Sequence, residues 1–174
     1  MRFRLQCVTL IVAITMTAVG SRAAMFQAPG AKPGSIRACA LFTQDEVKRF
    51  YGSKWVSAWD RVRIPPEEND LSGGGSECSM TGMMIQLDAV PVSRFEANRQ
   101  SYAKQSTFER TTGIGEEAWF YEQGAGTSVH IIGVYARTAQ HVFVLSVDVE
   151  KGETAASLRP VVVAAGQAAA AKLR

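Results

Sequence analysis

The chain has 174 residues, of which 47% are hydrophobic and 20% charged, and its formal net charge is +3 at pH 7. Three of the 19 basic residues, Arg2, Arg4 and Arg22, precede a predicted cleavage site, so 16 basic side chains are left against 16 acidic ones. Binding of nucleic acid through charge requires Lys and Arg clustered on one face, whereas the charges here are interspersed. We therefore expect no nucleic-acid partner.

The N-terminus has the residue order of a secretory signal. Met1–Arg4 carries two positive charges and no acid, Val8–Val19 is apolar, and small residues follow. This order predicts a signal peptide over residues 1–23, cleaved after Gly20 or Ala23. The apolar run is shorter than the ~20 residues that a transmembrane helix needs. We expect a periplasmic or secreted protein with no stable membrane span after cleavage; retention of the signal as an anchor is the alternative.

Cleavage would remove Cys7 and leave Cys39 and Cys78 as the one available pair. In an oxidising compartment such a pair is expected to form a structural disulfide. The alternative is a redox-active pair, which usually has Cys-x-x-Cys spacing beside a helix start. That spacing is absent from the sequence.

Residues 24–36 are rich in Ala, Pro, Gly, Lys and Ser without an apolar period, which predicts a disordered linker. A single domain is expected over residues 37–174. Its first helix is marked by Thr43 and Glu46, which have the spacing of a capping box, and it is expected to end near Tyr51.

A flexible acidic loop is predicted over residues 64–76, which contain Pro-Pro and Gly-Gly-Gly. Cys78 and Met80 then precede a turn near Thr81–Gly82, and apolar residues alternate with Gln86 and Asp88 beyond it. This alternation predicts a hairpin with one buried face, and therefore an antiparallel sheet.

A second helix is predicted after Pro91. Ser93 and Glu96 have capping-box spacing, and Phe95, Asn98 and Tyr102 would share one face. Three strands are predicted next, over residues 117–122, 128–137 and 140–150. An Ala-rich helix is expected from about Ser157, with Pro160 in its first turn. The order α-β-β-α-β-β-β-α predicts an α+β domain with an antiparallel sheet of about five strands, helices packed against it, and one disulfide.

Three stretches occur together in this chain: Cys39–Thr43 with Glu46–Val47, Glu77–Met80 with its cysteine, and Gly113–Trp119. The last has the pattern Gly-x-Gly-acid-x-Ala-aromatic. In these stretches the chain resembles small bacterial exported domains of unknown function, many of them lipoproteins, in which a cysteine before a capped helix bonds to one in the first hairpin. The resemblance covers most of the chain and implies a fold and a compartment but no reaction. The chain departs from it in lacking a lipid-attachment cysteine at the mature N-terminus.

The two histidines lie on the predicted last hairpin. With a turn at Thr138–Ala139, His141 faces Ala136 and His130 faces Val147, which places the histidines ~20 Å apart. They cannot ligate one metal at that distance, so we expect no metal site and no cofactor. Each is interpreted as a partly buried, satisfied histidine, with a lone catalytic base as the alternative.

Three aromatic residues are candidates for binding. Trp55 and Trp59 are four residues apart and form either a core pair or an aromatic platform for a glycan or apolar ligand. Tyr135 lies near Gly133, and a gap over that glycine would admit a ligand.

The sequence contains no Gly-x-Ser-x-Gly nucleophile motif, no complete dinucleotide fingerprint and no EF-hand spacing. We therefore expect an exported, non-catalytic domain that binds a small ligand or an envelope partner protein. The first alternative is an envelope hydrolase that uses His130 or His141 as the base, with a serine from another part of the chain. The second is a structural envelope component, favoured if the surface at Trp55 and Trp59 is a dimer interface.

Overall fold

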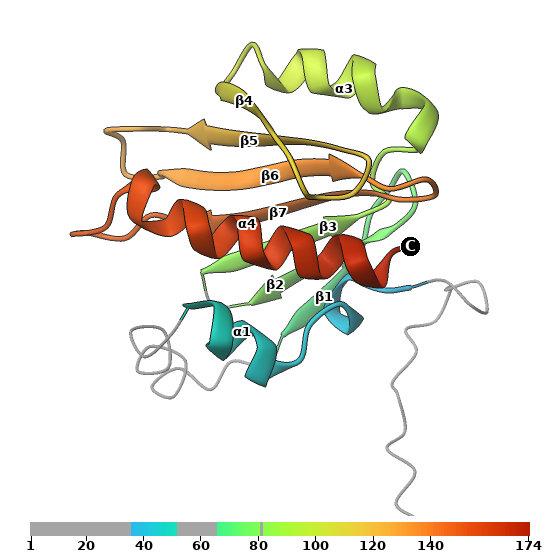
Figure 1. Cartoon of the computed structure of the whole chain (residues 1–174), viewed down its shortest axis with the longest axis horizontal. Helices are drawn as coiled ribbons and strands as arrows, with labels where there is room; N and C mark the ends of the chain where they lie inside the picture. Colours follow the sequence, from blue (N-terminus) through green and yellow to red (C-terminus); the bar gives the residue numbers. More distant parts are fainter. Residues whose placement is uncertain (1–35, 52–65, 81) are drawn as a thin grey trace, which may run out of the picture. The chain divides into compact units, whose positions relative to one another are not determined.

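The computed structural model describes residues 36–51, 66–80 and 82–174, all of which belong to one compact unit, Gly34–Arg174 (Figure 1). The predicted signal peptide, the predicted linker up to residue 35, and both Trp55 and Trp59 lie outside the described residues.

An antiparallel sheet of seven strands forms the centre of this unit, with the strand order β1-β2-β3-β7-β6-β5-β4. An α+β fold with one antiparallel sheet is therefore confirmed. The elements in chain order are η1 (Ala38–Ala40), α1 (Gln44–Tyr51), β1 (Glu67–Asp70), β2 (Ser76–Met80), β3 (Met83–Leu87), η2 (Val92–Arg94), α3 (Phe95–Tyr102), β4 (Thr107–Thr111), β5 (Glu117–Gln123), β6 (Ile131–Arg137), β7 (Val142–Asp148) and α4 (Ala155–Lys172).

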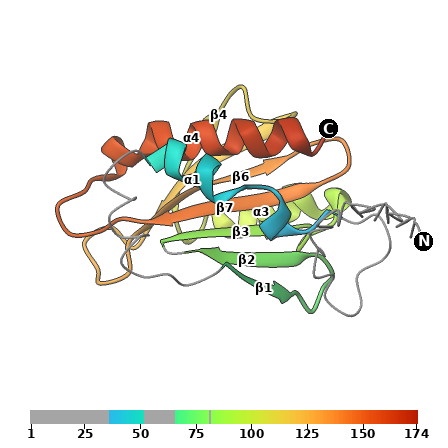
Figure 2. The same cartoon turned by 90° about the horizontal axis from the view of Figure 1, so that it is seen from below.

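Helices cover the two faces of the sheet unequally. α4 and α1 lie on one side (Figure 2), where the larger hydrophobic core includes Ile85, Leu145 and Val134 from the strands and Val162 from α4. α3 packs on the other face, where a smaller cluster includes Phe95 and Tyr135. We call these the α4 face and the α3 face.

The expected strand count was too low, because β1 and β4 were not predicted. Both are edge strands, and each has one hydrogen-bonded neighbour in the sheet. β1 is Glu-Glu-Asn-Asp and has no apolar residue, and β4 is Thr-Phe-Glu-Arg-Thr with a single one. Edge strands that bury few side chains carry little apolar alternation, so the pattern that identifies inner strands is missing from them.

The capping box at the start of α1 is confirmed. The Glu46 carboxylate accepts a hydrogen bond from the Thr43 N–H at 2.8 Å, and the Glu46 N–H donates to the Thr43 hydroxyl at 3.2 Å. Phe42 and Val47, which have hydrophobic-staple spacing, are both buried. The helix begins at Gln44 because these contacts satisfy two backbone donors that its first turn leaves unpaired.

The capping box predicted for the second helix is wrong. Ser93 lies inside η2, and the residue at the N-cap of α3 is Arg94, whose side chain makes no capping bond. The 3-10 turn after Pro91 leads directly into α3, so Ser93 never reaches the cap position. The predicted shared face is present, since all three residues contact Tyr135. Phe95 stacks on its ring, Tyr102 lies tilted against that ring, and the Asn98 amide donates to the Tyr135 hydroxyl.

α4 begins two residues earlier than predicted, because Thr154 and Ser157 form a reciprocal capping box. Pro160 therefore lies in the second turn rather than the first. The small residues of this helix allow it to approach the sheet closely. A Cβ built on Gly166 would lie 3.0 Å from a Val134 methyl and 3.1 Å from Ile114.

The turn between β6 and β7 lies one residue later than predicted. The Thr138 N–H donates to the His141 carbonyl at 2.8 Å, so Ala139 and Gln140 form the turn. The buried Thr138 hydroxyl donates to the Leu173 carbonyl at 3.1 Å, which holds Thr138 within the ladder. The register shifts accordingly by two residues: Ala136 faces Phe143, not His141.

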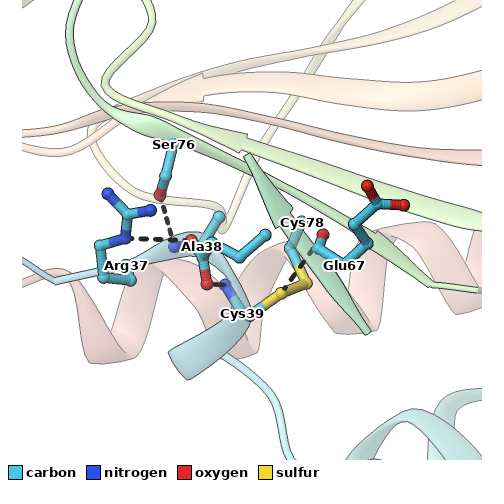
Figure 3. Close-up of a disulfide and its surroundings, with 7 residues drawn as sticks. Arg37, Ala38, Cys39, Glu67, Ser76 and Cys78 are labelled. Carbon is cyan, nitrogen blue, oxygen red and sulfur yellow. Dashed lines mark hydrogen bonds and ion pairs between the residues drawn. A yellow bond between two sulfur atoms is a disulfide. The ribbon is translucent and has the colours of Figure 1, made fainter. Parts of the chain in front are cut away.

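Cys39 and Cys78 form the predicted disulfide, which joins η1 to β2 (Figure 3). Polar contacts reinforce the same junction: the Ala38 N–H donates to the Ser76 hydroxyl at 2.8 Å, and Arg37 forms ion pairs with Glu68 and Asp70 on β1. The segment that enters the domain is thereby held against the first two strands. Within the described ranges, no helix is both long and apolar enough to cross a bilayer.

An ion pair between α1 and the end of α4 predicts a pH dependence. Lys172 Nζ lies 2.7 Å and 2.8 Å from the two Glu46 oxygens. Hydrogen bonds from Lys172 and from the Thr43 N–H lower the pKa of Glu46 to about 2. A depressed carboxyl pKa stabilises the fold above the unfolded-state pKa of ~4.3, and this contribution is lost as the pH falls through the folded-state value.

We expect Glu46→Gln to lower the free energy of unfolding at pH 7 by less than about 1 kcal/mol, because the pair is partly solvated. Glutamine preserves the capping box, so the variant isolates the charge. Denaturant unfolding of both proteins at pH 7 and about pH 2 checks this, since the difference should close between about pH 4.5 and 2. A constant difference across that range would contradict the charge contribution.

Candidate functional site

Tyr135, a predicted binding residue, lies in the middle of β6 beneath α3 and is 1% exposed. Its ring stacks on Phe95 with 4.6 Å between centroids, and its hydroxyl donates to the Phe95 carbonyl at 3.2 Å. Burial raises the pKa of Tyr135 to about 12. Both the ring and the hydroxyl of Tyr135 therefore make contacts inside the protein.

The space above Gly133 is filled. Gly133 pairs with Ser146 on β7, and Tyr121 lies over it: a Cβ built on Gly133 would be 2.6 Å from the Tyr121 ring and 2.4 Å from the Leu145 carbonyl. The absence of a side chain at Gly133 therefore leaves space that Tyr121 fills, and the gap suggested by the sequence is not open to a ligand. Desolvation correspondingly raises the pKa of the buried Tyr121.

The half-exposed Trp119 next to this cluster is also enclosed by its neighbours. Phe108 stacks against its ring at 5.9 Å, and the Arg99 guanidinium lies 4.4 Å from the ring centroid. Both contacts are intramolecular, and they pack Trp119 against β4 and α3.

The two histidines lie at opposite ends of the β6–β7 pair, and each contacts a carboxylate. His141 Nδ1 lies 2.8 Å from Asp88 Oδ2. Asp88 has a positive φ of 56°, held by its N–H donating to the Val142 carbonyl at 2.7 Å and by a carboxylate oxygen that accepts from the Val142 N–H at 3.3 Å. This pair closes the end of the β3–β7 ladder, which is a structural role.

The other histidine lies in an open cleft of about 460 Å³ at the opposite end of the strands. We call this the strand-end cleft. The turn between β5 and β6 and the loop between β7 and α4 form its walls, and both lie at the same end of the sheet (Figure 1). Its lining residues are Ser128, Val129, His130, Asp148, Val149, Glu150 and Lys151.

A rigid turn presents Val129 at the rim of the cleft. The Thr127 hydroxyl oxygen lies 2.8 Å from both the Gly124 and the Val129 carbonyl oxygens, and its one proton is shared between these two acceptors. A Cβ on Gly124 would lie 2.0 Å from the Val129 carbonyl, so the turn requires glycine at that position. Val129 is left 63% exposed, which is unusual among the large apolar residues that the structure describes.

The opposite wall is held by its own hydrogen bonds. The Glu150 N–H donates to the Glu153 carboxylate at 3.1 Å, and the Glu153 N–H donates to the Glu150 carbonyl at 3.0 Å. At the floor, the Val149 N–H donates to the His130 carbonyl at 2.8 Å. These contacts make the cleft a preformed feature of the fold.

The cleft contains charges of both signs. His130 Nε2 lies 2.8 Å from Glu122 Oε1, so Glu122 orients the imidazole. Partial burial raises the pKa of Asp148 above its usual value, although the residue keeps an exposed surface. Glu150 and Lys151 are exposed beside it. The arrangement offers apolar contacts from Val129 and Val149, surrounded by hydrogen-bonding and charged groups, without an enclosed apolar chamber.

No group of three or more histidine, cysteine or acidic side chains is placed to hold a metal ion in the described part of the chain. Smaller hollows of about 380 Å³ beside α3 and about 250 Å³ at the β4–β5 connection lie elsewhere. The second is formed around the Gly113–Trp119 stretch, whose Ile114 is buried against α4.

Sequence reasoning identified His130 but missed Val129, Glu122 and Asp148. The residues come from three separate segments, and their proximity follows from the β5–β6 register, in which Glu122 faces Ile132. The one signal available was the pair of glycines at 124 and 126, which marked a turn but not what the turn presents. A scan against protein-family models, a search of curated proteins and a search of solved structures each find no match for this chain.

Proposed function

We propose that this chain is an exported, non-catalytic domain that binds a segment of a partner protein at the strand-end cleft. The observation that carries the proposal is Val129, an apolar side chain 63% exposed on a rigid turn at the rim of a preformed cleft. Isolated exposed valines are common on protein surfaces. Here the valine adjoins His130, Lys151 and acidic groups, which is the apolar-centre and polar-rim composition of recognition surfaces.

The chemistry of the cleft favours a protein segment over a small apolar ligand. Small-molecule sites are usually enclosed and mostly apolar, whereas this cleft is open and lined largely by polar groups. The disulfide Cys39–Cys78 supports the proposed compartment, because disulfides persist in oxidising environments. The signal-like N-terminus and the resemblance to small exported bacterial domains also support export to an oxidising compartment.

Site-specific photocross-linking tests the proposal. A photoreactive residue at Val129, in protein exported by a bacterium, should trap a discrete partner. The same photoreactive residue at Ala164, which is exposed on α4 outside the cleft, should not.

The trapped partner is then purified and titrated calorimetrically. Val129→Asp and Lys151→Ala should each weaken its binding by at least about tenfold, and Ala164→Asp should leave it unchanged. Equal affinities for all four proteins would overturn the proposal.

A second candidate, the envelope hydrolase, rests on one specific arrangement. Glu122 orients His130 at 2.8 Å, and Ser128 lines the same cleft. Carboxylate, imidazole and hydroxyl are the three groups of a serine-hydrolase triad. A fluorophosphonate probe should label Ser128 under this hypothesis, and His130→Ala should abolish the labelling. Labelling that persists in Ser128→Ala, or no labelling of the exported protein, would rule the candidate out.

A further inference from the structure

β4 is an edge strand with one free side, and the hydrogen-bond pattern of the sheet identifies which of its residues face outward. In an antiparallel ladder, successive residues direct their N–H and C=O groups alternately to the two neighbouring strands. Two backbone hydrogen bonds at the ends of the β6–β7 ladder set the phase: the Val149 N–H donates to the His130 carbonyl, and the Thr138 N–H donates to the His141 carbonyl. Even-numbered residues of β6 therefore bond to β7, and odd-numbered ones to β5.

The same alternation carries across β5 to the edge. The register pairs Tyr135 with Trp119 and then Phe120 with Glu109. Odd-numbered residues of β5 bond to β6, and even-numbered ones bond to Thr107, Glu109 and Thr111 of β4. The backbone groups of Phe108 and Arg110 consequently point away from β5, toward the free side of the edge strand β4.

The outward residues of β4 are self-complementary about a two-fold axis through Glu109. A second, antiparallel β4 centred on that axis places Phe108 opposite Arg110 of the second copy, and Arg110 opposite Phe108. Each such pair exchanges two backbone hydrogen bonds, so four bonds form from groups that have no strand partner in the sheet. Thr107 faces Thr111 of the second copy, a favourable cross-strand pair.

The Glu109 side chains of the two copies would meet at the axis, where like charges are unfavourable. Each is already neutralised within its own chain, because Arg159 Nη1 of α4 lies 2.6 Å from Glu109 Oε2. This hydrogen bond lowers the pKa of Glu109. Two copies therefore bring two acids and two guanidinium groups to the axis, with no excess charge.

The opposite edge of the sheet is not self-complementary. By the same alternation, the outward residues of β1 are Glu68 and Asp70, and the strand carries three acids. Arg37 and the Cys39 N–H already engage the side chain of Glu68. A second copy of β1 would place acids against acids, so this edge is protected against pairing.

From these observations we infer that the chain forms a two-fold dimer by antiparallel pairing of β4 with β4 of a second copy, centred on Glu109, which joins the two sheets into one. The inference is independent of the proposed function, because the strand-end cleft is formed by other segments.

Sedimentation of the exported full chain over about a hundredfold range of concentration should show a monomer that becomes a dimer. Arg110→Pro removes an N–H that faces outward and leaves the β4–β5 ladder intact, so it should weaken dimerisation by at least about tenfold. Arg110→Ala keeps that N–H and should change the dissociation constant by less than about threefold. A monomer at every concentration, or a dimer unaffected by Arg110→Pro, would overturn the inference.

Two further measurements do not depend on the proline variant. Amide exchange at Phe108 and Arg110 should be slow in concentrated and fast in dilute wild-type protein, while Glu109 is protected in both. Glu109→Cys should form an intermolecular disulfide on oxidation, because residues that face each other at the axis lie ~4.5 Å apart. Thr107→Cys should not. Fast exchange at Phe108 in the dimer, or cross-linking at 107 in place of 109, would contradict the pairing.

Discussion

Replacing Cys39 and Cys78 together by alanine is expected to lower the free energy of unfolding by ~4 kcal/mol. The disulfide closes a loop with a sequence separation of 39 residues, and the chain-entropy argument assigns ~4 kcal/mol to a loop of that length. Few domains of this size have more than ~15 kcal/mol in total, so the effect is large. Cys78 is also fully buried in the main core, and its truncation adds to the loss.

Denaturant unfolding of the oxidised wild type, the reduced wild type and the double alanine variant measures this effect. The reduced wild type is the matched control, because it has the same open chain and keeps the Cys78 sulfur in the core. We expect the reduced protein and the variant to have similarly lowered free energies of unfolding, with that of the variant slightly lower. A reduced protein within about 1 kcal/mol of the oxidised one would show that Arg37 and Ser76 hold this junction without the disulfide.

Gly115→Ala is expected to lower the free energy of unfolding by about 3 kcal/mol. Gly115 has a φ of +59°, and a Cβ there would lie 2.3 Å from the Arg137 carbonyl. That carbonyl accepts a hydrogen bond from the Glu116 N–H at 2.9 Å, so the substitution displaces the start of β5 from β6. The left-handed backbone costs an alanine about 1 kcal/mol, and the steric overlap adds about 2 kcal/mol.

Gly126→Ala is the matched control for this prediction. Gly126 also has a positive φ, +81°, but a Cβ there meets nothing within 4 Å. We expect Gly126→Ala to lower the free energy of unfolding by only about 1 kcal/mol. Thermal and denaturant unfolding of both variants separates the backbone cost from the overlap. Equal losses at the two positions would show that the Arg137 carbonyl moves aside without penalty.

The contacts of Gly115 also explain the Gly113–Trp119 stretch that was noted in the sequence. Ile114 is inserted against α4, and the two following acids, Glu116 and Glu117, both pair with Arg137 on β6. The stretch anchors the entry to β5 between the sheet and α4. Its pattern is therefore accounted for by packing within the domain.

The amino-acid sequence by itself determined the elements whose signals are local. The capping box of Thr43 and Glu46 and the alternation from Cys78 to Leu87 each lie within a dozen residues, and the structure contains both features as predicted. The disulfide was predictable for a different reason: once the signal was set aside, one pair of cysteines was left.

Tertiary structure decided what depends on neighbours distant in the chain. β1 and β4 became strands because β2 and β5 supply their hydrogen-bond partners, although neither has an apolar pattern of its own. The β6–β7 register shifted because the Thr138 hydroxyl bonds to Leu173, which is 35 residues away. The strand-end cleft likewise exists because the register brings Glu122 to His130 and places the β7–α4 loop beside Val129. A local sequence pattern cannot predict such contacts, because they form only when the sheet brings distant residues together.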